Sequence, residues 1–268
     1  MVEYEKHLLT EESMKKQIAI VTGASGGIGK EFVKELLKEE LDEIWVIARS
    51  LNKLNELKEQ FGEKVVPISI DLSIRKEVLS VGERIKEVNP AILYLVNNAG
   101  LGKMGSSYQD FTIEESDKTI ELNCNTVVSM CIMCIPYMQR GSRILNISSQ
   151  ASFQPVPYLN LYAATKVFER SYSRALNMEL KKLGITVTAV CPGWIDTDML
   201  LEECNHRKVK FPGLVNPDIV AKKAMKDTKR GRDMSVCTFY VKYMHFLSKL
   251  FPQKMVMKKW VRSIRKYI

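Results

Sequence analysis

Acidic residues are missing from the C-terminal end of this chain: Met234–Ile268 contains eight lysines and arginines but no aspartate or glutamate. The whole chain has 40 basic and 31 acidic residues, so its formal charge of +9 is unevenly placed. Its three histidines are scattered, and its six cysteines show no paired framework, which argues against a metal centre or a disulfide scaffold. No nucleic-acid reader motif accompanies the positive charge, so we expect no nucleic-acid partner.

Long apolar runs are also missing. No window reaches the length that a bilayer-spanning helix needs, and residues 1–16 are too charged for a signal peptide. We therefore expect an N-terminal extension over 1–16 and a cytoplasmic protein with reduced thiols. Cys131 and Cys134 form a CxxC pair at helical spacing, for which core packing is a better interpretation than a metal or redox role. A length of 268 residues, 46% of them hydrophobic, suits one α/β domain or two small ones.

A glycine-rich turn follows the first apolar run, residues 18–21. The turn is Thr22-Gly23-Ala24-Ser25-Gly26-Gly27-Ile28-Gly29, and a helical pattern covers 30–39. Glycines allow backbone N–H groups to approach a pyrophosphate at a helix N-terminus. A strand, a glycine turn, a helix and a second strand about 20 residues on together predict a dinucleotide-binding unit.

The second strand, 43–48, ends at Arg49-Ser50 and lacks the acidic residue that would bond an adenosine ribose 2′-hydroxyl. A guanidinium binds phosphate oxygens bidentately, so Arg49 favours NADP(H) over NAD(H). A solvated arginine at a strand end is the alternative. The loop has no basic residue before Gly27, so the choice of cofactor depends mainly on Arg49.

Two more strands end in polar residues that the same sheet edge would bring together. The strand 65–70 ends in Asp71-Leu72, where Asp71 either faces the ligand crevice or caps the helix 74–88. The strand 92–96 ends in Asn97-Asn98-Ala99-Gly100, whose small and amide side chains allow close cofactor approach and tie strand ends together.

Tyr162 and Lys166 are four residues apart in YAATK, so on a helix they share a face. Tyrosine ionises only at alkaline pH, and a neighbouring ammonium favours the phenolate. Ser149 follows the apolar run 143–148, where its hydroxyl could orient a carbonyl oxygen. A half-buried aromatic beside a solvated lysine is the alternative interpretation of the pair.

These motifs, with Asn123 in the helical stretch 113–139 and CPGWIDT at 191–197, resemble in order and spacing the classical short-chain dehydrogenase/reductases over about residues 17–230. Residues 146–180 look like the bacterial group described as estradiol 17-beta-dehydrogenase 12-like. The resemblance implies a single Rossmann-type, doubly wound α/β domain, with a mostly parallel seven-stranded sheet flanked by helices. We expect it over 17–233, with a basic amphipathic extension over 234–268.

The resemblance also implies an Asn-Ser-Tyr-Lys tetrad. Tyr162 would be the general acid/base, Ser149 would hold the substrate oxygen, Lys166 would bond the nicotinamide ribose, and Asn123 would bind a relay water. No metal is expected. The expected cofactor contacts are Gly23, Ser25, Gly27, Ile28, Gly29, Arg49, Ser50, Asp71, Leu72, Asn98, Ala99, Gly100, Tyr162, Lys166, Pro192, Gly193, Ile195 and Thr197. For Pro192-Gly193, a simple turn ending the strand 187–190 is the alternative.

Substrate choice should depend on residues 198–213. Apolar residues there predict a lid (Met199, Leu200, Leu201, Phe211), while basic ones hold an anionic tail or face water (His206, Arg207, Lys208, Lys210). Phe153, Val156, Tyr158 and Leu159 favour a lipophilic carbonyl, with ketosteroids, ketoacyl chains and smaller ketones all open.

Residues 239–268 mix large apolar residues with lysines at helical spacing. This pattern is typical of a helix on an anionic membrane surface, and equally of one packed on its own domain or on a partner subunit. Relatives imply a homodimer or homotetramer paired through 113–139 and 161–182. The sequence predicts an NADP(H)-dependent reductase or dehydrogenase; the alternative is a non-catalytic NADP(H)-binding regulatory or scaffold protein, which would often have lost Tyr162 or Lys166.

Overall fold

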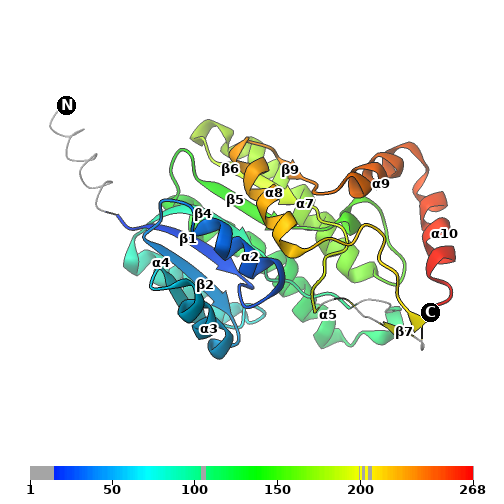
Figure 1. Ribbon diagram of the computed structural model, residues 1–268, viewed down its shortest axis with the longest axis horizontal. Coiled ribbons are helices and arrows are strands. Elements are labelled where there is room, and N and C mark those ends of the chain that lie inside the picture. The colour runs from blue at the N-terminus through cyan, green and yellow to red at the C-terminus, as the bar shows by residue number, and fades with distance from the viewer. Residues whose placement is uncertain (1–14, 104–106, 199, 201–202, 205–206, 268) are drawn as a thin grey trace.

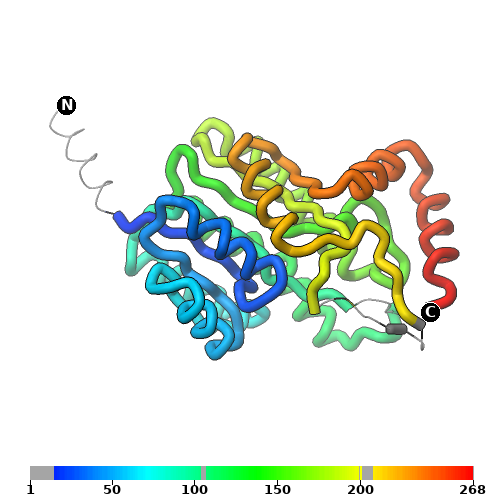
Figure 2. The backbone as a smooth tube through the Cα atoms, viewed as in Figure 1, coloured from blue at the N-terminus to red at the C-terminus, as the bar shows by residue number. Residues whose placement is uncertain are grey.

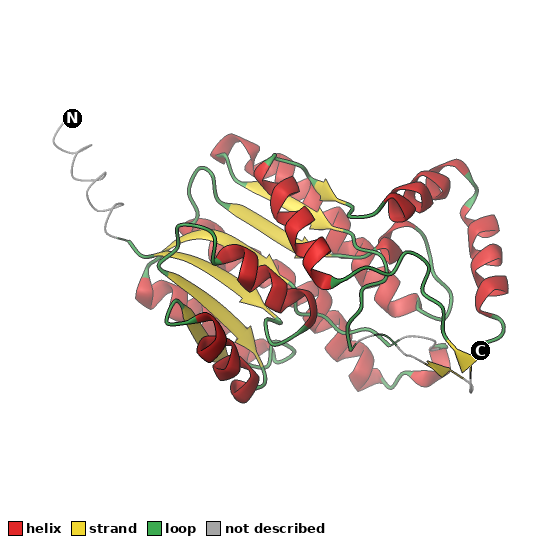
Figure 3. Cartoon of the chain, viewed as in Figure 1, coloured by secondary structure: helices red, strands yellow, loops and turns green. Residues whose placement is uncertain are grey.

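The structure is a computed structural model that describes residues 15–103, 107–198, 200, 203–204 and 207–267. Its centre is a seven-stranded sheet in the order β3-β2-β1-β4-β5-β6-β9. The strands are β1 (Gln17–Thr22), β2 (Glu43–Ala48), β3 (Val65–Ser69), β4 (Ala91–Asn97), β5 (Arg143–Ile147), β6 (Thr186–Val190) and β9 (Met234–Ser235). Every neighbouring pair is parallel, so the strand ends meet at one edge (Figure 3).

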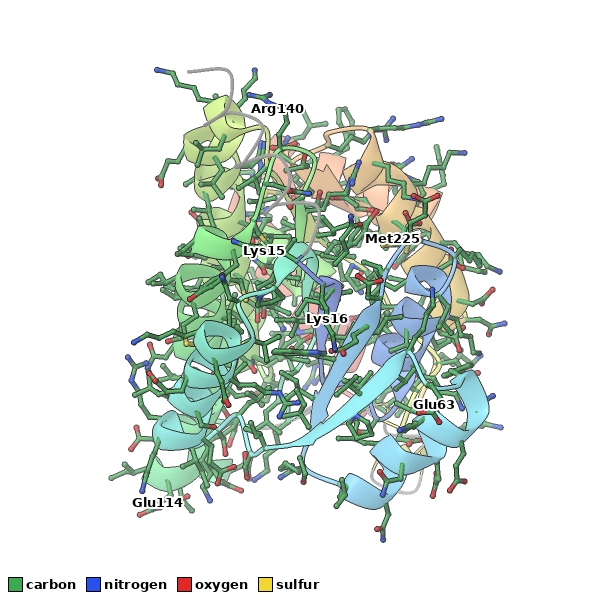
Figure 4. The ribbon with its side chains drawn as sticks, turned by 90° about the vertical axis from the view of Figure 1, so that its left-hand side faces the viewer. Lys15, Lys16, Glu63, Glu114, Arg140 and Met225 are labelled. Atoms are coloured by element: carbon green, nitrogen blue, oxygen red, sulfur yellow. The ribbon has the colours of Figure 1, made fainter. Side chains whose placement is uncertain are left out.

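Helices cover both faces of the sheet, which confirms the predicted doubly wound α/β architecture. One face packs on α2 (Gly27–Leu36), α3 (Leu51–Phe61) and α8 (Pro217–Lys229); the other packs on α4 (Arg75–Val88), α6 (Thr126–Cys134) and α7 (Asn160–Leu180). In Figure 4 the sheet is seen with helices on either side, and Met225 marks α8. Because both faces are covered, β1 and β2 are continuous apolar runs rather than alternating ones.

The strand order reverses between β1 and β4. In open parallel sheets, ligands bind outside the carboxyl ends of the strands at such a switch point. The glycine turn after β1 and the Asn98 loop after β4 meet there. The fold therefore brings the two predicted cofactor segments to one place.

A continuous helical stretch, Ile113–Tyr137, is long and apolar enough by length and composition to cross a membrane, so the expectation that no segment reaches this length was wrong. It consists of α5 (Ile113–Ile120), a π-helical turn η2 (Glu121–Asn125), α6, and a short 3-10 turn η3 (Ile135–Tyr137). Met130, Cys131 and Cys134 are fully buried against the sheet. This apolar surface serves the core, and burial raises the pKa of the Cys131 thiol to about 12.

The last strand, β9, pairs with β6 and lies beyond the domain end that we expected at residue 233. A strand of two residues is too short to show in a charge or hydropathy pattern. After it, α9 (Phe239–Leu250) and α10 (Gln253–Ile264) form a helical pair that stands away from the sheet (Figures 1 and 2). A small antiparallel pair, β7 (Glu203–Cys204) and β8 (Arg207–Lys208), lies near the end of α10 in the same view.

Candidate active site

The glycine turn between β1 and α2 is shaped by close contacts. Gly23 has φ of 62°, and a Cβ there would lie 2.9 Å from the backbone of Ala99. A Cβ on Gly29 would lie 2.2 Å from the carbonyl oxygen of Gly23, so this glycine permits the helix to pack on the turn. Helix α2 begins after Gly26, which offers no side-chain cap, and its first turn has no acidic residue. The positive end of the helix is therefore available to an anion.

Asn98 joins the ends of β1 and β4. Its Nδ2 donates to the carbonyl oxygens of Thr22 and Gly23, at 3.2 and 2.9 Å. The backbone N–H groups of Asn98 and Ala99 in turn donate to Thr22 Oγ1, both at 3.0 Å. This network holds the switch point rigid, as the amide residues at this position predicted.

Arg49 and Lys53 lie together at the rim of the cavity that begins at the glycine turn. Neither forms a salt bridge within the part of the chain that the structure describes. Ser50 instead caps α3, where its Oγ accepts from the N–H of Lys53 at 3.4 Å. Sequence reasoning missed Lys53, although its position four residues after Arg49 at the start of a helix was a usable signal.

Asp71 and Leu72 lie outside the cavity lining. The Asp71 carboxylate closes a turn on Ser73, accepting from its N–H at 2.9 Å and from its hydroxyl at 2.7 Å. The proposed capping alternative is wrong, because α4 is capped by Ile74 without a side-chain bond. Leu72 is buried, and its carbonyl oxygen accepts from Thr126 Oγ1 at 2.7 Å.

Tyr162 and Lys166 share a face of α7, as their spacing predicted. Lys166 Nζ lies 5.5 Å from the centroid of the Tyr162 ring. The same ammonium donates to the carbonyl oxygen of Ile147 at 2.8 Å and to both carboxylate oxygens of Glu169, at 2.8 and 3.0 Å. Lys166 and Glu169 are 4% and 1% exposed, so this is a buried ion pair beside the tyrosine.

Burial and the charge of the partner act in opposite directions on each member of this pair. It raises the pKa of Glu169 to about 7, against the opposing pull of Lys166. Burial lowers the pKa of Lys166, but the charges of Glu169 and Tyr162 outweigh it, and the net shift is upward. Lys166 therefore stays an ammonium at neutral pH. Glu169 was not among the predicted site residues; its spacing of three from Lys166 was visible, but such pairs are common on exposed helix surfaces.

Ser149 and Asn123 approach the same centre from β5 and from the π-helical turn. Ser149 is nearly buried, lines the cavity, and accepts from the N–H of Ala151 at 3.1 Å. Asn123 lies deeper: its amide exchanges hydrogen bonds with the backbone N–H and carbonyl of Leu101, both at 2.8 Å, and donates to Thr165 Oγ1 at 3.0 Å. Its side chain therefore holds the loop after Gly100 against α7 and does not line the cavity.

One cavity of about 540 Å³ brings most of these residues together. Its lining includes the following predicted residues: Gly23, Ser25, Gly27, Ile28, Arg49, Asn98, Ala99, Gly100, Ser149, Tyr162, Lys166, Pro192, Gly193, Ile195 and Thr197. Gly29, Ser50, Asp71, Leu72 and Asn123 do not line it. Leu159, Trp194 and Leu200 supply apolar wall beside the predicted set.

The residues expected to contact the substrate do not all line the same cavity. Leu159 lines this cavity, whereas Phe153 and Val156 line a neighbouring one against α10, and Tyr158 lines neither. Phe211 packs on Trp194 with ring centroids 5.1 Å apart. Of the predicted lid, Met199 and Leu201 lie outside the described residues, as does His206, and the side chain of Arg207 is likewise not described.

These residues fit a nicotinamide dinucleotide on structural grounds. The uncapped start of α2 suits a pyrophosphate, and Arg49 and Lys53 place two cations on the cavity lining, with the charge of Arg49 also acting on Asp71. Two glycines leave space along the cavity: a Cβ on Gly27 would lie 3.3 Å from Thr197, and one on Gly100 would lie 3.3 Å from Lys166 Nζ. A cavity of this size with convergent polar groups is typical of a cofactor site.

A family model described as short chain dehydrogenase matches residues 17–208, which is more than half of the chain. The chain therefore belongs to the short-chain dehydrogenase family and is an oxidoreductase of that family.

Named relatives and a solved structure agree with this family. Very-long-chain 3-oxoacyl-CoA reductase of Anas platyrhynchos is 37% identical over 195 residues, covering 68% of this chain and 60% of that protein. The 17-beta-hydroxysteroid dehydrogenase type 3 of Rattus norvegicus is 33% identical over 190 residues, covering 68% of this chain and 61% of that protein. The chain thus spans about three fifths of these two relatives. The structure of a short-chain dehydrogenase from Sphingobium yanoikuyae in complex with NADPH superposes with a TM-score of 0.75 at 25% identity, covering 90% of this chain and 95% of that one.

Proposed function

We propose that this chain is an NADP(H)-dependent carbonyl reductase or alcohol dehydrogenase acting on a lipophilic substrate, with Tyr162 as general acid/base. The observation that carries the proposal is the placement of Tyr162, Lys166 and Ser149 on one cavity that continues to the glycine turn of α2. The bound nicotinamide would supply or accept the hydride. The chain's own residues would stabilise the negative charge that hydride addition places on the substrate oxygen and would supply the proton that neutralises it, with the reverse in oxidation.

Ser149 and Tyr162 would hold the substrate oxygen between two hydroxyl groups. Donors already aimed at a developing negative charge stabilise it without reorganisation. Tyr162 then gives its proton to that oxygen in reduction and takes it back in oxidation. The Lys166 ammonium lies 5.5 Å from the centroid of the Tyr162 ring, beside the group that exchanges this proton. Positioned acid–base groups contribute about 10² to 10⁴ in rate.

Glu169 and Asn123 would support this centre from behind. Glu169 and the Ile147 carbonyl fix the ammonium of Lys166 in the cavity wall while leaving its ring contact with Tyr162 in place. Asn123 lies in the π-helical turn, where the regular backbone ladder is interrupted. We propose that a carbonyl of this turn holds the water that returns a proton to the tyrosine, with the Asn123 side chain bracing the turn.

Arg49 and Lys53 are proposed to prefer NADP(H). A 2′-phosphate adds charge and acceptor oxygens that two cations at the cavity rim can bind. The complex of the Sphingobium relative with NADPH supports a nicotinamide cofactor in this fold.

The substrate class follows from the apolar walls and from the relatives. Leu159, Trp194 and Leu200 line the cavity near Tyr162. The two relatives named above carry the names of a long-chain ketoacyl reductase and a hydroxysteroid dehydrogenase, both of which imply lipophilic substrates. We propose a ketosteroid, a ketoacyl chain or a similar ketone.

We also propose a homodimer or homotetramer and a peripheral membrane contact through residues 239–268. The expected pairing helices carry exposed apolar side chains, namely Ile120 and Ile132 on one and Phe168 and Met178 on the other. The alternative of a non-catalytic binding protein is less well supported, because Tyr162 and Lys166 are both present and adjacent.

The test follows NADPH absorbance with ketosteroids, β-ketoacyl thioesters, aliphatic ketones and aldehydes, in wild type and in Tyr162→Phe. We expect consumption that the phenylalanine variant loses by at least about a hundredfold, with NADPH binding nearly intact. Equal turnover in the variant would remove the role of the tyrosine. Tight NADPH binding without turnover on any class would favour the non-catalytic alternative.

A further inference from the structure

Helix α9 exposes a continuous apolar stripe. Phe239, Tyr243, Phe246 and Leu250 follow one another at spacings of four, three and four, which places them on one face, and they are 85%, 50%, 57% and 59% exposed. The opposite face holds Val241, which is the buried residue of α9, while α10 has no buried residue. Phe251 and Met255 extend the apolar surface to the start of α10, at 47% and 57% exposure.

The charges around this stripe have one sign. Lys242, Lys249, Lys254, Lys258 and Lys259 are exposed, and none of them is in a salt bridge within the described residues. A second copy of this surface would bring its own eight basic residues and no acidic one, so self-pairing is opposed by like charge. An anionic bilayer offers the apolar stripe a hydrocarbon surface and offers the lysines a negative one.

The helical pair is also attached to the walls of the catalytic cavity. Trp260 of α10 donates its Nε1–H to the carbonyl oxygen of Pro157 at 2.8 Å and packs on the same small apolar cluster as Tyr162 does. His245 of α9 lies with its ring 4.0 Å from that of Phe153. Val241 packs so closely on Gly193, a cavity-lining residue, that a Cβ there would lie 2.6 Å from it.

Between α10 and this wall lies a second cavity of about 520 Å³. Phe153, Val156, Ala163 and Met257 line it, and Val156 and Ala163 belong to the apolar cluster on which Tyr162 packs. A space lined by these apolar residues, and also by Gln154, Asn160 and Arg170, therefore lies between α10 and residues 152–157, next to the catalytic cavity.

We infer that α9 and α10 dock on an anionic lipid bilayer and present the catalytic cavity to it, so that a lipophilic substrate enters from the membrane beside the Gln150–Leu159 loop. This inference rests on the proposed function for the identity of the substrate, but the docking itself does not require turnover.

The docking test is flotation of the full chain with vesicles of phosphatidylcholine, alone or mixed with phosphatidylserine. Wild type should float with the anionic vesicles and not with the neutral ones. Lys258→Glu with Lys259→Glu should weaken partitioning at least about tenfold, while the same charge change at Lys76 and Lys86 on α4 should not. Phe246→Ser with Leu250→Ser should weaken it similarly, while Ile113→Ser with Leu79→Ser, at side chains 78% and 48% exposed, should not.

Three results of these experiments would contradict docking on an anionic bilayer. Flotation that is equal for the α10 and α4 charge variants would overturn it, as would no flotation of wild type. A concentration-dependent dimer that Phe246→Ser with Leu250→Ser dissociates without lipid would overturn it in favour of a second copy.

The entry route has its own readout. The α9 and α10 variants should lose kcat/KM on a ketone dissolved in anionic vesicles and keep it on a water-soluble ketone. An equal loss on both ketones would overturn the route. Tyr162→Phe should float like wild type although it loses turnover. Wild type that floats but consumes none of the ketones would count against the proposed function alone.

Discussion

Helices α2 and α10 have similar lengths and are both amphipathic, yet they are held in opposite ways. In α2 the apolar face is buried: Phe32, Val33 and Leu36 are fully inaccessible against the sheet. In α10 no residue is buried, and the helix is attached mainly through Trp260. An apolar helix face thus predicts that this face is covered by another apolar surface. Whether that surface is the core of the same chain is decided by the tertiary structure.

The largest effect on stability is expected when a buried phenylalanine of α2 is replaced by alanine, compared with an exposed phenylalanine of α9. Phe32→Ala should lower the free energy of unfolding by about 4 kcal/mol, because it opens a cavity in the core. Phe239→Ala, at a side chain 85% exposed, should change it by less than about 0.5 kcal/mol. Urea unfolding of both variants measures this, and similar losses would mean that α9 is part of the folding core.

A smaller effect concerns pH and the buried pair. The pKa of Glu169 is about 7 in the folded chain and about 4.5 ordinarily, so between these values the folded state keeps a proton that the unfolded state releases. Stability from this group is full below about pH 4.5 and is lost as pH rises through about 7, by at most about 3 kcal/mol. Glu169→Gln removes the titration, so wild type should lose stability relative to it between about pH 4.5 and about pH 7.

His245 on α9 offers a control of opposite sign. Burial, followed by the charges of Lys249 and the nearby arginines, lowers the pKa of His245, so its contribution is present above its ordinary pKa and is lost as pH falls. Wild type should therefore gain stability relative to His245→Gln as pH rises through about 6.5. If the stability difference from wild type changed with pH in the same direction for Glu169→Gln and His245→Gln, the assigned directions of the two pKa shifts would be wrong.

Two pairs of basic residues separate cofactor binding from membrane binding. Arg49→Ala with Lys53→Ala should weaken NADPH binding by about ten- to a hundredfold and leave NADH within about twofold. Lys258→Ala with Lys259→Ala should leave both cofactors unchanged. Titration of protein fluorescence with each cofactor measures the ratio, and an unaltered NADPH to NADH ratio in the first variant would eliminate the 2′-phosphate site.

The smallest expected effect lies at the attachment of α10. Trp260→Phe keeps the aromatic packing and removes the hydrogen bond to Pro157, which is worth about 1 kcal/mol. Amide hydrogen exchange should become faster over Gln253–Ile264 while the sheet strands keep their protection. Unchanged exchange in α10 would show that other contacts hold the helix.

Short-range patterns were enough for most of the Rossmann fold. The strand 43–48 has the predicted bounds, and the helix predicted over 74–88 runs over 75–88, because the periods of buried residues are local properties of a chain. The helix after the glycine turn begins at Gly27, three residues before the pattern starts, since glycines carry no hydropathy signal. The two-residue strand β9 is invisible for a similar reason: it is defined by its partner β6.

In the candidate site, too, local spacing predicted some features and tertiary contacts decided the others. The spacing of Tyr162 and Lys166 was sufficient to place both on one face, because a helix repeats every 3.6 residues. Asn123 was expected to bind a relay water through its helix backbone, which stays a prediction; only the tertiary contacts show that its side-chain amide bonds to Leu101 and Thr165. Phe153 and Val156 were expected near the substrate, and the fold turns them to the neighbouring cavity against α10.

By itself the sequence determined the strand and helix order, the glycine turn and the catalytic pair, since each depends on residues a few positions apart. Only the tertiary structure decided that Glu169 pairs with Lys166 in the interior, that Lys53 joins Arg49 at the cavity rim, and that α9 and α10 reach the cavity walls. Burial and contacts between distant segments arise from how the elements pack, and no local spacing encodes them.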